Sequence, residues 1–118
     1  MKLIFVYNSD DTVLSLIKDT AHKMVSPNTY PCNLCRITYP GVSMREDWQK
    51  FIQSLPNEVV FLHRDEFHKQ YPDKKNIQLP AAFHENSAGL ELLIPHTEIN
   101  KAKKVKDLIE IVKHFLPK

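Results

Sequence analysis

The sequence predicts an α/β fold, in which a central, mostly parallel sheet carries helices on both faces and ends in a C-terminal β-hairpin. Three observations support this prediction. Residues 2–7 and 59–62 are short apolar runs, which is typical of strands buried in a parallel sheet. Stretches with helical periodicity alternate with these runs, and two later apolar runs are joined by a short segment that contains a glycine. Because strands that alternate with helices form right-handed parallel units, we expect one sheet covered by helices.

The N-terminal part begins with the strand at 2–7. Asp10 or Asp11 is expected to cap a helix. The apolar positions of that helix recur every three to four residues, at Val13, Leu14, Ile17, Ala21, Met24 and Val25. Residues 27–42 are expected to form a connection. Within it, the β-branched and aromatic residues of 35–39 predict a possible short strand.

A second helix and a second strand follow this connection. Ser43 and Glu46 have the spacing of a capping box, in which each side chain bonds the backbone N–H of the other residue. The helical stripe that follows stops at Pro56, and its members are Met44, Trp48, Phe51, Ile52 and Leu55. We assign Trp48 to the core. Residues 59–62 then form the second strand.

The C-terminal part adds a hairpin and a last helix. Residues 63–71 predict a loop and a helical turn. The runs 80–84 and 90–94, joined by 85–89, predict a β-hairpin. Residues 105–116 predict an amphipathic helix, with its apolar stripe at Val105, Leu108, Ile109, Val112, Phe115 and Leu116.

Length and composition describe one ordinary domain. The chain has 118 residues, of which 42% are hydrophobic, so we expect a single domain over 1–118. Sixteen basic and fourteen acidic residues are too balanced for a nucleic-acid or membrane surface. The first apolar run is too short for a secretory signal, and no run reaches the roughly 20 apolar residues of a membrane helix. We therefore expect a cytoplasmic protein, of undefined oligomeric state, that binds neither nucleic acid nor membrane.

Several segments resemble thioredoxin-fold proteins. They are VVFLHRDEF at 59–67, LPAAF at 79–83, LELLIP at 90–95 and KVKDLIEIVKHFL at 104–116. In that fold, a strand is followed by a short helix, a proline with a cis peptide bond, a hairpin and a final helix. The resemblance implies a thioredoxin-like fold and makes Pro80 the structural cis-proline, with a cis Leu79–Pro80 bond.

The chain also resembles a small, functionally uncharacterised bacterial family. The shared patterns are Tyr-x-Cys-x-Leu-Cys, Phe-Leu-His-Arg-Asp-Glu-Phe and Pro-Ala-x-Phe. Sequences of that family are sometimes labelled as GTPases. The residues do not support this label, because a phosphate-binding loop needs several glycines and a lysine, and the chain has only Gly41 and Gly89.

Cys32 and Cys35 form a Cys-x-x-Cys pair, but in an unusual place. Thioredoxins carry this pair directly after the first strand, at the start of the first helix. Here it follows the first predicted helix, whose ~14 residues would carry the chain about 21 Å. If 35–39 is a parallel strand, both cysteines lie near the opposite edge of the sheet. If 27–42 is a long loop, they return towards Pro80.

Three roles of the pair remain open. As a redox couple, it serves thiol–disulfide exchange or redox sensing with a protein thiol or disulfide partner, and needs no cofactor. The chain is then a possible thiol–disulfide oxidoreductase. We expect the more exposed thiolate to attack and assign this role to Cys32, with Cys35 resolving the mixed disulfide. No helix is predicted to begin directly after Cys32.

The other two roles use the same residues differently. As a metal clip, Cys32 and Cys35 would supply two thiolates for zinc or Cu(I). His63 and His68 are then the candidate partners. As structural residues, the cysteines would be small core side chains of a non-catalytic interaction domain.

A second polar cluster, HRDEFH, follows the strand at 59–62. It should share a sheet edge with Asn8, Ser9, Asp10 and Asp11, and with the Pro80 loop, because ligand sites of α/β sheets lie beyond the carboxyl ends of the strands. His63 is a candidate general base or ligand, oriented by Asp65 or Glu66. Alternatively, one of these two carboxylates caps a short helix and Arg64 pairs locally.

Overall fold

The computed structural model describes residues 2–8, 32–38 and 45–116, without the side chains of Asn33, Cys35 and Arg36. Its elements are β1 (Lys2–Val6), α2 (Asn33–Thr38), α3 (Glu46–Ser54), β2 (Glu58–Leu62), α4 (Arg64–Gln70), the 3₁₀ turn η2 (Pro72–Lys74), β3 (Ala81–Asn86), β4 (Gly89–Ile94), α5 (His96–Ile99) and α6 (Val105–Phe115). The helix predicted to begin at Asp10 or Asp11 lies outside the described residues.

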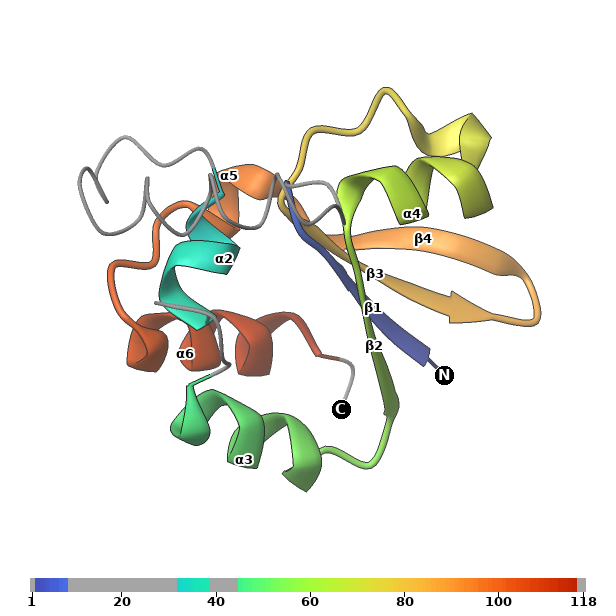
Figure 1. Cartoon of the computed structure of the whole chain (residues 1–118). Helices are drawn as coiled ribbons and strands as arrows, with labels where there is room; N and C mark the ends of the chain where they lie inside the picture. Colours follow the sequence, from blue (N-terminus) through green and yellow to red (C-terminus); the bar gives the residue numbers. More distant parts are fainter. Residues whose placement is uncertain (1, 9–31, 39–44, 117–118) are drawn as a thin grey trace.

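The sheet has the strand order β2-β1-β3-β4 (Figure 1). β1 pairs with β2 in parallel, with Leu3 beside Val59. β1 pairs with β3 in antiparallel orientation, with Val6 beside Ala81, and β3 pairs with β4 as an antiparallel hairpin. The prediction of a thioredoxin-like fold with a central, mostly parallel sheet is therefore wrong. This α/β protein has one small mixed sheet, in which a single parallel pair is joined to two antiparallel ones.

The connection from β2 to β3 spans residues 63–80 and contains helix α4, of 7 residues, and the turn η2. It brings the chain back to the end of the sheet where β1 and β2 finish. β3 therefore enters beside Val6, at the end of β1, and runs the opposite way.

Strand β1 contributes side chains to two hydrophobic cores, because successive side chains of a strand point to opposite faces. Leu3, Phe5 and Tyr7 pack into the first core, which also contains buried residues of α2, α3 and α6. Ile4 and Val6 pack into the second core, which contains residues of α4 and β3. Helices thus cover both faces of the sheet, and among the described helices α4 is the one that packs against the second core (Figure 1).

Residues 33–38 form helix α2, so the short strand predicted at 35–39 is wrong. Leu34, Ile37 and Thr38 are all buried. Their spacing of three and four positions gives them one common face on a helix, which a strand would split between two faces. The Thr38 hydroxyl donates a 2.7 Å hydrogen bond to the Leu34 carbonyl. Burial of this face outweighs the β-propensity of the segment.

The other described elements agree with the sequence more closely. Helix α3 begins at Glu46 with Arg45 at its N-cap, whereas the predicted cap at Ser43 lies outside the described residues; Trp48 is fully buried as predicted. The predicted hairpin is confirmed, although its connection is shorter than expected. Gly89 has a φ of 120°, which favours glycine. The C-terminal helix is confirmed as α6.

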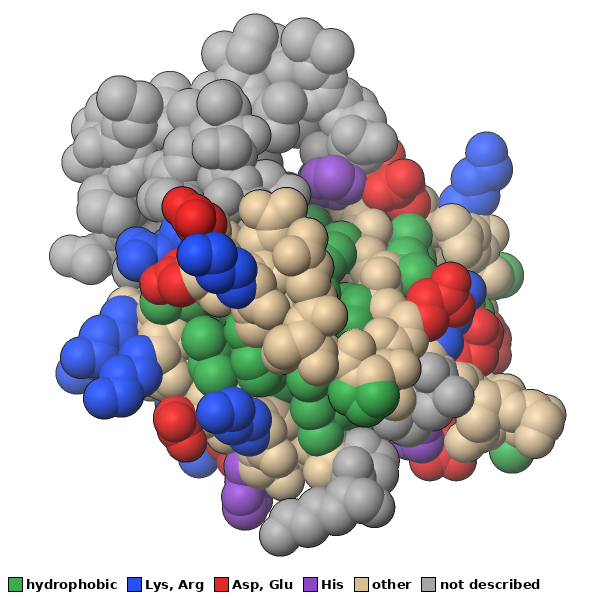
Figure 2. All heavy atoms as spheres, turned by 90° about the horizontal axis from the view of Figure 1, so that it is seen from below, with side chains coloured by type: hydrophobic (Ala, Val, Ile, Leu, Met, Phe, Trp, Pro, Cys, Tyr) green, Lys and Arg blue, Asp and Glu red, His purple; other side chains and the backbone are tan. Residues whose placement is uncertain are grey.

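The end of the molecule where α3 lies has a mixed surface. Figure 2 shows hydrophobic side chains in the middle of this view, with charged side chains of both signs around them. Phe51, Ile52 and Leu55 are partly buried and pack against the first core. Among the described helices, none combines the length and the apolar character needed to cross a membrane.

Candidate functional site

Cys32 lies at the carboxyl end of β1. The Tyr7 N–H donates a 2.9 Å hydrogen bond to the Leu62 carbonyl, which prolongs the pairing with β2 by one residue. The next N–H, that of Asn8, donates to Sγ of Cys32 over 3.3 Å. Cys32 therefore lies at the edge where β1 ends, and not at the opposite edge of the sheet. It directly precedes helix α2, so a helix does begin after Cys32, contrary to the sequence-based expectation.

The Cys32 side chain is oxidised and buried. Its sulfur takes part in a disulfide bond. Its exposed fraction is 0%, and it belongs to the first core together with Tyr7, Leu34 and Trp48. The expectation of an exposed sulfur at Cys32 is therefore wrong for this oxidised state. Cys35 lies in helix α2, but its side chain is outside the described residues.

Pro80 lies at the same end of β1. It directly precedes Ala81, which pairs with Val6, and its side chain is buried. The Leu79–Pro80 peptide bond is cis, the geometry that the resemblance implied for it. Cys32 and Pro80 thus flank the last residues of β1, although 48 positions separate them in the chain.

His63 is engaged in capping helix α4. Its backbone N–H donates to Oε1 of Glu66 over 2.9 Å, and its Nδ1 lies 3.0 Å from the same oxygen. The ring also contacts that of Tyr7, with 5.5 Å between the ring centroids. Of the two carboxylates proposed as caps, Glu66 therefore has this role.

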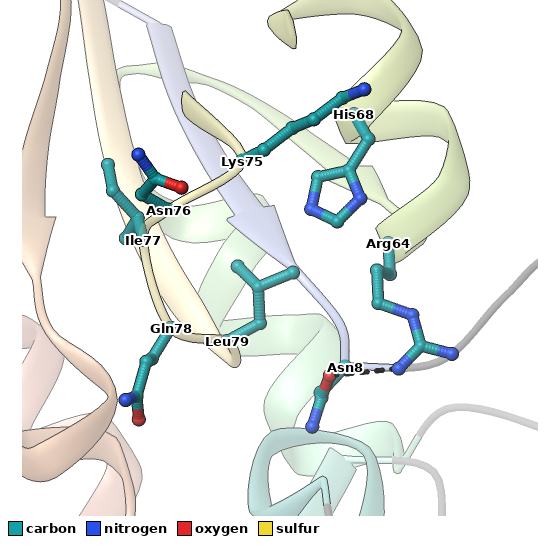
Figure 3. Close-up of a pocket in the computed structure, with 8 residues that line it drawn as sticks. All are labelled: Asn8, Arg64, His68, Lys75, Asn76, Ile77, Gln78 and Leu79. Carbon is teal, nitrogen blue, oxygen red and sulfur yellow. Dashed lines mark hydrogen bonds between the residues drawn. The ribbon is translucent and has the colours of Figure 1, made fainter. Parts of the chain in front are cut away.

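Arg64 also contacts a residue that is remote in the chain (Figure 3). Its Nη1 donates to Oδ1 of Asn8 over 3.3 Å, across 56 positions of the chain. His68 lies one turn further along α4, and the two side chains line a pocket with a volume of about 330 Å³. Sequence reasoning had placed Asn8 and the HRDEFH segment at one sheet edge, but it had not identified Lys75, which also lines this pocket. The sequence signal that could have identified Lys75 was its positive charge at a position shortly before the Pro80 loop.

In the described part of the chain, the proposed metal ligands do not form a cluster that could hold a metal. Within 2–8, 32–38 and 45–116, no group of three or more His, Cys, Asp or Glu side chains could hold a metal ion. His63 bonds Glu66, and His68 lies in the pocket beside Arg64. A sulfur in a disulfide lacks the thiolate charge that zinc and Cu(I) ligands need.

A second hollow, of about 410 Å³, lies over the start of α3. Here each charged lining residue has a partner of opposite sign. Arg45 Nε lies 3.0 Å from Asp47, and Lys50 Nζ lies 3.2 Å from Glu46. The hydrogen bond from Arg45 lowers the pKa of the Asp47 carboxyl. We interpret this hollow as a set of exposed surface ion pairs.

No protein-family model, curated protein or solved structure matches this chain. The class of this protein is therefore defined by its fold and its site alone. It is an α/β protein whose first strand ends against an oxidised cysteine and beside a basic pocket.

Proposed function

We propose that Cys32 and Cys35 are disulfide partners and form a reversible couple for thiol–disulfide exchange or redox sensing in the cytoplasm. The observation that supports this best is the hydrogen bond from the Asn8 N–H to Sγ of the oxidised Cys32. A backbone donor aimed at a sulfur stabilises the thiolate that forms there on reduction. A cysteine that serves only to fill the core does not need such a donor.

Cys32 is assigned as the sulfur that leaves as a thiolate, because its burial keeps external thiols away from it. The reductant is an external dithiol. Its thiolate cannot reach a side chain with 0% exposure, so it attacks the sulfur of Cys35 instead. The disulfide bond breaks, and its electron pair goes to Sγ of Cys32, next to the Asn8 N–H. The second thiol of the external dithiol loses its proton, attacks the mixed disulfide and releases Cys35 as a thiolate. The external dithiol is oxidised and the protein pair is reduced. The attacking and resolving roles are thereby exchanged relative to the sequence-based assignment.

The test compares the wild-type chain with Cys32→Ser and Cys35→Ser. Each variant is mixed with the disulfide of 2-mercaptoethanol, and the mixed disulfide is followed by mass spectrometry. Cys32→Ser should form it on the order of tenfold faster than Cys35→Ser, because the remaining thiol of the latter is buried. Equal rates would contradict the assignment of roles.

The wild-type chain is equilibrated in parallel with graded ratios of oxidised and reduced dithiothreitol. A reversible couple interconverts within this range. A disulfide that resists every ratio would indicate a purely structural bond. Stoichiometric zinc or copper in the reduced protein, lost in Cys32→Ser, would instead favour the metal clip.

A further inference from the structure

The two edges of the sheet are protected unequally against pairing with a further strand. The strand order places β2 at one edge and β4 at the other. Along β4, the pairing with β3 is irregular near Phe83, and the charged side chain of Glu91 is 65% exposed. Proteins use irregular pairing and charged side chains to keep an edge strand from pairing further. By contrast, β2 pairs with β1 regularly from Glu58 to Leu62 and contains neither lysine nor proline.

The central residues of β2 are apolar and remain partly exposed. Val59, Val60 and Phe61 are half-buried, whereas their partners on β1 are each only 1% exposed. Val59 and Phe61 pack against the first core, and Val60 packs against the second. In Figure 1, α3 lies on one side of β2 and α4 on the other. The two cores cover this strand incompletely, so more of its apolar surface can be buried beyond its outer edge.

The outer edge of β2 presents the backbone groups of Val59 and Phe61. The Leu62 carbonyl accepts a hydrogen bond from the Tyr7 N–H, so the backbone groups of Leu62 face β1. The N–H and C=O of one residue point to the same side of a strand, and successive residues alternate, so those of Val59 and Phe61 face outwards. The described part of the chain offers these outward groups no hydrogen-bond partner.

His63 holds the third outward position, but its backbone is engaged within its own subunit. Its N–H donates to the Glu66 carboxylate over 2.9 Å, and its carbonyl accepts from the Phe67 N–H over 2.9 Å. A strand added to this edge of β2 therefore forms its hydrogen bonds with Val59 and Phe61.

We propose that β2 pairs with β2 of a second copy of this chain, in antiparallel orientation, about a two-fold axis at Val60. In this register, Val59 lies opposite Phe61 of the partner subunit. The two residues exchange a pair of hydrogen bonds and the symmetry repeats this pair, so every outward N–H and C=O of both strands is used. An aromatic side chain beside a β-branched one is also a favourable cross-strand pair.

The charge of Glu58 favours the antiparallel orientation. In a parallel pair, Glu58 would lie beside Glu58 of the partner subunit, and like charges in such a position are destabilising. In the antiparallel register Glu58 lies opposite Leu62 of the partner subunit. The two carboxylates are then about 13 Å apart along the strands, where salt screens most of their repulsion. Cys32 takes no part in this interface, so the proposal does not rest on the redox function.

The first test measures hydrogen exchange of the ¹⁵N-labelled full chain at several protein concentrations. The amides of Val59 and Phe61 should become protected as the concentration rises, together with the appearance of a dimer in analytical ultracentrifugation. The amides of Val60 and Leu62 face β1 and should be protected at every concentration. A chain that stays monomeric would overturn the proposal, and so would a dimer in which the amides of Val59 and Phe61 exchange freely.

Charge substitutions at Val60 test the position of the two-fold axis. Val60→Lys and Val60→Glu each place two like charges opposite each other and should weaken self-association about tenfold. An equimolar mixture of the two variants should restore association as a heterodimer, because the facing charges then have opposite sign. Two folded variants that do not associate in the mixture would contradict this register.

Leu90→Lys is the matched control for these substitutions. Leu90 is half-buried against the same core as Val60, but it lies on the other edge strand, β4. This variant should associate like the wild-type chain, and an equal loss of association would show that β2 is not the interface. If the charged variants of Val60 fail to fold, the exchange measurement on the wild-type chain decides the result.

Discussion

The backbone N–H of Asn8 donates a 3.3 Å hydrogen bond to Sγ of Cys32, 24 positions further along the chain. This bond joins the end of β1 to the start of α2. It holds the sulfur at the edge of the sheet where Pro80 also lies, inside the first core. The same asparagine uses its side chain to hold Arg64 at the basic pocket. Asn8 therefore contacts both Cys32, just before α2, and Arg64 of helix α4.

Removal of the Asn8 N–H should disfavour the reduced state of Cys32. Asn8→Pro lacks this donor. A hydrogen bond to a charged group contributes about 1.5 kcal/mol, so the equilibrium with dithiothreitol should move about tenfold towards the disulfide. Asn8→Ala is the control, because it keeps the N–H while losing the side chain. Thiol titration measures both equilibria, and circular dichroism checks the fold. Identical equilibria in two folded variants would rule out a role of this bond.

Trp48 should be among the most sensitive core positions. Its ring is fully buried and meets the ring of Phe5 edge-on, with 5.6 Å between the centroids. Trp48→Ala should lower the free energy of unfolding by about 3–5 kcal/mol, because a large cavity remains. Leu92→Ala, at a side chain that is 44% exposed on β4, should cost less than about 1 kcal/mol. Urea denaturation followed by circular dichroism compares the two. Similar losses would contradict this picture of the core.

Glu66 should stabilise the start of α4. Its carboxylate accepts the backbone N–H of His63, one of the donors at a helix start that have no partner within the helix. Glu66→Ala should cost about 1 kcal/mol of unfolding free energy. Glu66→Gln keeps an oxygen acceptor and should lose less. Denaturant titration provides the measurement, and a loss in Glu66→Gln as large as in Glu66→Ala would show that the acceptor is not the stabilising group.

Tyr71 should make the stability depend on alkaline pH. Burial, followed by the hydrogen bond to Glu85, raises the pKa of the Tyr71 hydroxyl above its ordinary value. In the window above about pH 10, the unfolded chain therefore releases this proton while the folded chain keeps it. The folded state then binds more protons, so the free energy of unfolding falls as the pH rises through this window.

Tyr71→Phe removes the titrating group, and the decline above about pH 10 should become smaller. At neutral pH the variant should lose about 1 kcal/mol, because the 2.9 Å bond to Glu85 is absent. Urea denaturation at several pH values from 8 upwards tests both statements. An equally steep decline in Tyr71→Phe would assign the pH dependence to other groups.

The site was only partly accessible from the sequence. The position of His63 after a strand placed it at the correct sheet edge, and a carboxylate three residues later indicated the cap, because both features are local. The contact of Arg64 with Asn8 spans 56 positions and leaves no local pattern. The burial of Cys32 likewise depends on Trp48 and Tyr7, which are remote in the chain.

The amino-acid sequence by itself determined the elements whose signal lies in a local pattern of residues. Strands β1 and β2, the hairpin and helix α6 are of this kind, because a short apolar run, turn chemistry and a helical stripe act within a few neighbouring residues. Tertiary structure decided the rest. It set the direction of β3, made α2 a helix and brought Cys32 to Asn8. Each of these outcomes depends on which distant surfaces are buried against each other, and that free energy exists only once the chain has folded.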